Sequence, residues 1–220
     1  MWAIAWGLSG CLSQPDPGGN PPITHVGAFG SADDSADSIS ATLDVANAGD
    51  AVVAHVFCGS SSSPRFTLTG LDFAPLDQDG NENLWVASFG AITTEPSSVT
   101  ISATGTNCGA LGMVLIGDEF HGTSTAGGSA TFDAAIVKMS LVVSPTAAQI
   151  TTNNDNDAVW AAATVGGQLT GPGSGFDGGG SAAGNFSEYK ITTARAGTHE
   201  DVSFQGVPDV WIMTLVTLAQ

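Results

Sequence analysis

Basic residues are almost absent from this chain of 220 residues. It has 4 lysines and arginines against 21 aspartates and glutamates, for a formal net charge of -17. Such a chain repels phosphate backbones and anionic headgroups, so we expect no nucleic-acid partner. The acidic surface has two explanations: solubility outside the cell, or a saline habitat in which ions screen self-repulsion.

Long apolar runs and helical periodicity are also scarce. The apolar run at residues 1–8 is too short to cross a bilayer, which takes about 20 residues. Hydrophobic residues nevertheless make up 42% of the chain, which is enough for a core. The composition therefore excludes a disordered chain despite its many glycines.

What the chain does contain is short β-type runs separated by glycine, proline, asparagine or aspartate. SISATLDV alternates polar and apolar residues, whereas ALGMVLIG and VWIMTLVTL are continuously apolar, as strands at the centre of a packed sandwich are. The pattern predicts an all-β protein, namely a single jelly-roll-like antiparallel β-sandwich of two packed sheets. We place this domain at residues 23–220, after an apolar segment and a Pro/Gly/Ser-rich tether at residues 1–22.

The order of these elements resembles the jelly-roll-type β-sandwich of exported bacterial surface proteins and phage virion proteins. The resemblance rests on Gly49-Asp50 before AVVAHVF, NLWVASFGAI after a DGN turn, the corner VLIGDEFHGT and the closing VWIMTLVTLAQ, and it covers residues 25–220. It implies a surface, adhesive or carbohydrate-contacting module and brings no catalytic residue with it.

The opening segment resembles a bacterial lipobox. In Leu8-Ser9-Gly10-Cys11, small residues precede a cysteine, which implies lipidation of Cys11 and a membrane contact made only through that anchor. No basic residue precedes the apolar run, which leaves two explanations open: the start of the sequence is misassigned, or the N-terminus is uncleaved and docks into a partner.

The other two cysteines form an even pair. Cys58 ends one apolar run and Cys108 begins another, and neighbouring antiparallel strands would bring these positions together. We predict a Cys58–Cys108 disulfide, which suits an exported protein. The alternative is two buried thiols in a reducing compartment.

Two clusters combine acids with histidine: residues 117–121, of sequence GDEFH, and His199-Glu200-Asp201. Such groups can ligate a metal or transfer a proton. We favour a simpler interpretation of the first, a solvated strand end whose Phe120 packs inward. His25 and His55 are expected to be core histidines, and we predict no catalytic residue and no transition-metal site.

Calcium is the one ion for which the sequence offers a pattern. Asp77, Asp79, Asn81 and Asn83 alternate around a glycine bend, like the start of an EF-hand loop, although position 88 is serine where that loop has glutamate. Ordinary turn chemistry explains the same residues. A second acidic stretch lies at residues 153–157.

The glycine-rich stretch 166–186 is the candidate for a carbohydrate contact, and a mobile surface loop with no ligand is an equally open alternative. This stretch reads as a long loop carrying Phe176, Asp177 and Asn185, which are residue types that contact sugars. The three tryptophans in strand runs are expected to lie in the core instead: Trp85, Trp160 and Trp211.

Three functions remain as hypotheses. The first is a non-catalytic, surface-exposed structural or adhesive module, extracellular or lipid-anchored at the cell surface, whose partners are surface glycans or further copies of itself in a homo-oligomer. The second is a virion component such as a decoration, fibre or tail protein. The third is a glycan-acting enzyme. We expect no cofactor, with calcium as the one alternative.

Overall fold

The structure is a computed structural model that describes residues 21–81, 83–108 and 112–220. Across these residues the chain forms seventeen strands and one short 3-10 helix, η1 (Gly128–Ala130), and every strand pair is antiparallel. The predicted all-β sandwich is confirmed. Cys11 and the lipobox-like stretch lie outside the described residues. Within the described ranges, no helix combines the length and the hydropathy needed to cross a membrane.

The strands fall into two groups along the chain. Those of the first half are β1 (Thr24–Asp33), β2 (Ser38–Val45), β3 (Ala51–Gly59), β4 (Phe66–Thr69), β5 (Ala74–Asn81), β6 (Leu84–Ile92), β7 (Ser97–Gly105) and β8 (Met113–His121). Those of the second half are β9 (Phe132–Ser144), β10 (Ala147–Thr151), β11 (Ala158–Val165), β12 (Leu169–Gly171), β13 (Asp177–Ala182), β14 (Asn185–Ile191), β15 (His199–Ser203), β16 (Gln205–Gly206) and β17 (Asp209–Leu218).

The second half repeats the topology of the first. The first half forms a five-stranded sheet in the order β1-β8-β3-β6-β5 and a three-stranded sheet β2-β7-β4. The second forms a five-stranded sheet β9-β17-β11-β14-β13, with β10-β15 and β12-β16 in place of the smaller sheet. β15 and β16 together correspond to β7. We call residues 24–121 the first repeat and residues 132–218 the second; each is a jelly-roll-like sandwich.

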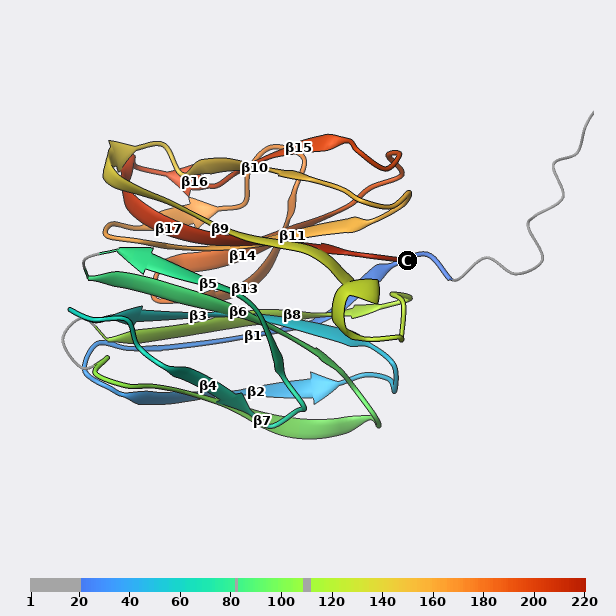
Figure 1. The fold of residues 1–220 in the computed structure, drawn as a ribbon, viewed down its shortest axis with the longest axis horizontal. Helices are drawn as coiled ribbons and strands as arrows, with labels where there is room; N and C mark the ends of the chain where they lie inside the picture. Colours follow the sequence, from blue (N-terminus) through green and yellow to red (C-terminus); the bar gives the residue numbers. More distant parts are fainter. Residues whose placement is uncertain (1–20, 82, 109–111) are drawn as a thin grey trace, which may run out of the picture.

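The two repeats stack into four layers (Figure 1). The five-stranded sheets face each other in the middle, and the small sheets form the two outer layers. The strands are therefore divided among five sheets, whereas the sequence analysis expected two. The physical reason is that the middle strands of both central sheets are largely apolar and are buried on both faces: every residue of β3 is buried, as is every residue of β11 except the last. Such a sheet needs a covering layer on each side.

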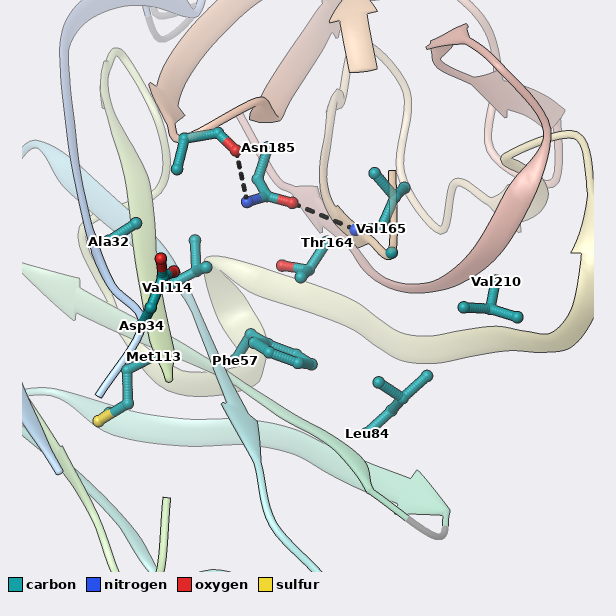
Figure 2. Close-up of a pocket in the computed structure, with 12 residues that line it drawn as sticks. Ala32, Asp34, Phe57, Leu84, Met113, Val114, Thr164, Val165, Asn185 and Val210 are labelled. Atoms are coloured by element: carbon teal, nitrogen blue, oxygen red, sulfur yellow. Dashed lines mark hydrogen bonds between the residues drawn. The ribbon is translucent and has the colours of Figure 1, made fainter. Parts of the chain in front are cut away.

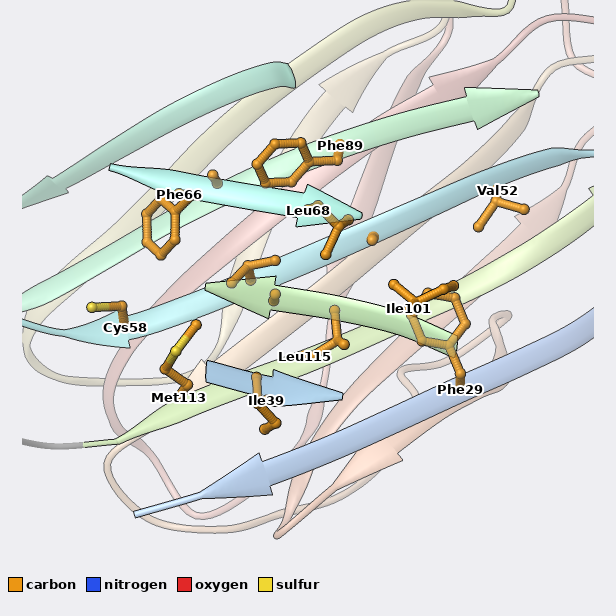
Figure 3. Packing of buried hydrophobic residues seen from close by; sticks show 14 of the residues in the cluster. Phe29, Ile39, Val52, Cys58, Phe66, Leu68, Phe89, Ile101, Met113 and Leu115 are labelled. Carbon is orange, nitrogen blue, oxygen red and sulfur yellow. The ribbon is translucent and has the colours of Figure 1, made fainter. Parts of the chain in front are cut away.

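The first repeat has its own core between its two sheets. Phe29, Val52 and Leu115 of the five-stranded sheet pack against Ile39, Ile101 and Leu68 of the three-stranded sheet (Figure 3). At one edge of this core Cys58, in β3, forms the predicted disulfide with Cys108, which follows β7. The bridge thus links the two layers of the first repeat.

A second core lies between the repeats. Val53, Phe120 and Phe132 pack with Trp160 and Val216 near one end, and a smaller cluster around Phe57 and Ile212 lies toward the other. At one side β13 lies so close to β1 that a Cβ on Gly180 would be 2.5 Å from the Phe29 carbonyl oxygen. Only glycine allows this approach, which explains the glycine-rich sequence of β13.

The first and last described residues lie together at one end of the molecule. The Gln220 side chain donates a hydrogen bond to the Pro21 carbonyl oxygen at 3.0 Å, and the C-terminus lies beside the start of β1 in Figure 1. β1 runs from this end to the opposite one.

Reducing the disulfide should destabilise the protein. The bridge closes a loop with a sequence separation of 50, worth about 4 kcal/mol in the chain-entropy model. We expect the reduced protein, or a Cys58→Ala/Cys108→Ala variant, to melt several degrees below the oxidised protein in calorimetry. Peptide mapping without reductant should recover one linked fragment. Two free thiols in freshly purified protein would contradict the bridge.

Candidate functional site

A cavity of about 320 Å³ opens between the two repeats where the central sheets end (Figure 2). Its lining comes from both repeats: Ala32, Asp34, Phe57, Leu84, Met113, Val114, Thr164, Val165, Gly166, Ala183, Asn185 and Val210. The volume lies at the lower end of the range for small-ligand pockets. Because the walls belong to both repeats, the cavity depends on the stacking of the two central sheets.

The polar side chains of this cavity are used mainly to hold its walls. Asn185 accepts a hydrogen bond from the Val165 amide at 3.1 Å and donates one to the Ala182 carbonyl at 3.1 Å, which ties the β13–β14 turn to the end of β11. Thr164 lies 3.0 Å from His55 Nε2. Asp34, exposed at the rim, is the one ionisable residue in the lining. The arrangement suits binding of an apolar group better than catalysis.

Exposed apolar side chains adjoin the cavity. Leu84 and Val210 also line a shallower hollow of about 210 Å³, together with Leu141 and the polar residues Asn81 and Asn83. Next to Leu141 in the chain, Val142 and Val143 are 71% and 70% exposed, and Val207, close to Val210 in the chain, is 75% exposed. We call Leu84, Leu141, Val142, Val143, Val207 and Val210 the apolar end.

A register shift in the sheet produces this exposure. Asp209 pairs with Ser144, whereas Trp211 pairs with Ser140, so three residues of β9 stand opposite one residue of β17. These three residues bulge out of the ladder, and the Ser140 hydroxyl donates to the Val142 carbonyl inside the bulge at 2.8 Å. Bulges of this kind redirect side chains at sheet edges.

The cluster at residues 117–121 is not the solvated strand end that the sequence analysis favoured. β8 continues to His121, and Asp118 and Glu119 are both fully buried. Phe120 packs inward as expected. The acids are buried because β8 is covered on one face by the second repeat and on the other by the outer layer of the first.

Asp118 joins the two repeats. Its carboxylate accepts hydrogen bonds from the Trp160 indole at 2.6 Å, the Gly180 amide at 3.1 Å, the Ser187 hydroxyl and His25 Nε2, which lies 2.8 Å away. Three of these donors belong to the second repeat. A fully buried carboxylate needs such a set of donors to offset the loss of water.

The two histidines expected in the core differ in their surroundings. His55 is fully buried, with Nδ1 3.0 Å from the Thr214 hydroxyl and Nε2 3.0 Å from that of Thr164, and burial lowers its pKa to about 3. The expected satisfied core histidine is therefore confirmed. His25 is only partly buried and stacks on Tyr189, with ring centroids 4.3 Å apart.

Buried carboxyl groups occur at equivalent places in both repeats. Asp50 and Asp157 immediately precede β3 and β11, and each backbone carbonyl accepts a threonine amide. Burial raises the pKa of Glu119, beside Asp50, to about 7, and the Asp50 charge adds to the effect. Burial raises the pKa of Asp157 to about 7, with a further contribution from Asp133.

One oxygen in each carboxyl pair lacks a hydrogen-bond partner: Glu119 Oε2 and Asp157 Oδ1. Protonation would let each of these oxygens donate to its acidic neighbour. In the first pair His121, 43% exposed at its side chain, lies 2.6 Å from Asp50 Oδ1. A third buried acid, Glu188, accepts from the Gly173 amide at 2.6 Å, and burial raises its pKa to about 7. Of these three acids, only Glu119 lies in a cluster for which the sequence predicted a solvated strand end, and for Glu119 that prediction is wrong.

The other acidic cluster divides among separate partners. Glu200 is buried and pairs with Lys190 at 2.6 Å, while Asp201 accepts from Gln149 and His199 contacts the Thr151 hydroxyl. Throughout the described ranges, no group of three or more His, Cys, Asp or Glu side chains is arranged to hold a metal ion.

The residues proposed for calcium lie mostly in a strand and not in a turn. Asp77, Asp79 and Asn81 belong to β5, an edge strand whose exposure suits polar side chains, and Asn83 immediately precedes β6. Asp77 accepts the Val137 amide of β9 at 2.9 Å and so links the repeats. An extended strand does not curl its carboxylates around one ion as an EF-hand loop does.

The proposed ligand loop is also mostly strand. Residues 166–186 contain β12 and β13; Phe176 and Asn185 are buried, and only Asp177 is exposed. Phe176 belongs to the core of the second repeat. Trp160 and Trp211 are buried as expected, and Trp85, partly buried, packs against the core of the first repeat. The cavity could not be predicted from the sequence, because its lining comes from seven segments that are far apart in the chain.

Comparison with known proteins identifies no relative: no protein-family model, no curated protein and no solved structure matches the chain.

Replacing Asp118 tests the link between the repeats. In Asp118→Asn the side chain keeps its shape but has one acceptor oxygen in place of two. Some of the donors that bond to the second carboxylate oxygen in wild type would lose their acceptor. We expect a loss of about 3 kcal/mol of unfolding free energy in chemical denaturation. Asp79→Asn, at an exposed position of β5, is the matched control and should stay close to wild type. Equal stability of the two variants would show that the network contributes little.

Stability should fall as pH rises from about 4.5 to 7. Glu119, Asp157 and Glu188 have ordinary pKa values of 4.5, 3.8 and 4.5 and folded values of about 7, so the folded state holds more protons in this window. His55 makes the protein more stable as pH rises between about 3 and 6.5, because burial lowers its pKa, but this is one group against three acids. We expect the highest melting temperature between about pH 4 and 5.

The measurement is calorimetry across this range at constant ionic strength. Glu188→Gln should reduce the decline in melting temperature, whereas Glu95→Gln, at an exposed position, should leave it as in wild type. A melting temperature that rises steadily from pH 5 to 7.5 would contradict the argument.

Proposed function

We propose that this chain is a non-catalytic, exported surface module that works by structural or adhesive contact, and that its contact surface is the apolar end. The observation that carries the proposal is the exposure of Val142, Val143 and Val207, each at 70% or more, beside a cavity between the repeats. Scattered exposed apolar residues need no explanation, but a group of them next to a hollow marks an interaction site.

Both the shape and the chemistry of the apolar end favour a protein partner. The bulge in β9 presents three consecutive apolar side chains, and the lining of the adjoining cavity includes apolar side chains such as Phe57 and Val114. An aliphatic or aromatic side chain of a partner would fill this cavity and lose its contact with water, as interface anchors do. Because the same surface is available on each copy, contact between copies is the simplest form of the proposal.

Export and a non-catalytic role have separate support. The Cys58–Cys108 disulfide suits an oxidising compartment. The strongly perturbed groups, such as His55 and Glu188, are enclosed between layers and bonded to neighbouring strands, which fits a structural use. Attachment through Cys11 stays a prediction, and a virion component remains the alternative.

Self-association should depend on the apolar end. We expect wild-type protein to form dimers or larger assemblies with rising concentration in size-exclusion chromatography with light scattering. Val142→Asp/Val143→Asp should remain monomeric, because two carboxylates would have to be desolvated in the contact. Val26→Asp, at a partly exposed position of β1, is the matched control and should associate like wild type. Equal association of all three proteins would place the contact elsewhere.

A further inference from the structure

The outward face of the three-stranded sheet is an array of hydroxyl groups. Every outward position of β7 between Ser98 and Thr104, of β4, and of β2 between Ser38 and Thr42 is serine or threonine. Asp44, beyond one corner, is the first charge along β2. In a chain with 21 acidic residues, an uncharged face of this extent is a distinct surface.

Strand pairing arranges these hydroxyls in rows. Thr67, Thr104 and Ser38 form one row across the three strands, and Thr69, Ser102 and Ser40 form the next. Neighbouring strands lie about 4.8 Å apart, and alternate residues along a strand about 6.8 Å apart. Within the second row the Ser40 and Ser102 hydroxyls are 2.8 Å apart, at hydrogen-bond distance. The face is thus a two-dimensional lattice of hydroxyl and methyl groups.

The layer behind this lattice is firmly packed. Ile39, Leu43 and Ile101 point inward from the same strands and are buried in the core of the first repeat. The disulfide joins this layer to the central sheet at one edge. The strand backbones that carry the hydroxyl groups are therefore held in place without a partner.

The array is not a consequence of the topology. The corresponding outer layer of the second repeat carries Gln149 hydrogen-bonded to Asp201 and Thr151 bonded to His199, which are mixed and partly charged groups. Since the two repeats share one strand arrangement, the difference lies in the sequence.

We propose that this hydroxyl face is a binding surface for ice. Exchanging hydrogen bonds with liquid water for bonds to a soluble partner gives little net free energy per bond. Binding to a solid lattice is different, because many weak contacts form together while the protein loses its translational and rotational freedom only once. The face has no aromatic ring for sugar stacking, and its only charges are at its borders, Asp44 at one corner and Arg65 one row beyond Thr67. Ordered water, which is uncharged and hydrogen-bonds in a fixed array, matches both properties.

The test measures how the purified protein partitions between slowly growing ice and the remaining liquid. Wild type should be enriched severalfold in the ice fraction relative to Thr100→Lys, which places a bulky charge in the central strand. Thr42→Lys, on the neighbouring strand, is a second variant with the same expected loss, in case one substitution impairs folding. Gln149→Lys, on the outer layer of the second repeat, is the matched control and should partition like wild type. Circular dichroism melts confirm that each variant is folded.

Two outcomes would overturn the proposal. Exclusion of wild-type protein from ice to the same degree as Thr100→Lys would show that the face does not bind ice. Binding of wild type, but not of Thr100→Lys, to insoluble chitin or cellulose, together with exclusion from ice, would make the face a polysaccharide surface instead. The result is independent of the apolar end, because Val142→Asp/Val143→Asp leaves the hydroxyl face intact and should still enter ice.

Discussion

The packing of one five-stranded sheet against the other is the contact on which the remaining features depend. It covers the second face of β3, β8, β11 and β17, and this explains why these strands are buried along almost their whole length. It also surrounds Asp118 and His55 with donors and acceptors from the opposite repeat. Where the two sheets end, the same packing leaves the cavity.

The two repeats share a topology but have diverged in the side chains at their contact. His25 stacks on Tyr189, whereas the equivalent pair on the other side is Phe132 over Gly90, where a Cβ would meet the ring at 2.6 Å. Asp118 corresponds in register to Val216. The two sides therefore fill the same space differently, one with a charged network and the other with apolar packing.

Local patterns were enough to predict the strands and the disulfide. AVVAHVFC and VWIMTLVTL predict buried strands because their apolar character is contained within one segment, and Cys58 and Cys108 lie at the ends of such segments. The four layers were not predicted, although GDAVVAH and NDAVWAA recur at equivalent places in the two halves. Recognising that recurrence would have indicated two sandwiches.

The candidate sites were harder to predict because their partners are distant in the sequence. Asp118 looks like a solvated strand end until Trp160, Gly180 and Ser187 are placed beside it. Residues 166–186 read as a loop because glycine is common in loops, but in β13 glycine serves a close approach between two strands. A cavity whose walls come from both repeats leaves no signal in any single segment.

Pro21 and Gln220 meet at one end of the molecule, and the cavity lies at the opposite end, so the two ends of the double sandwich differ. β1 begins close to this end and leads from it to the cavity, over about 30 Å for its ten residues. In a protein held by a tether at Pro21, this end would therefore face the surface of attachment. The exposed valines of the apolar end would then point away from that surface, and the hydroxyl face would lie along one side of the molecule.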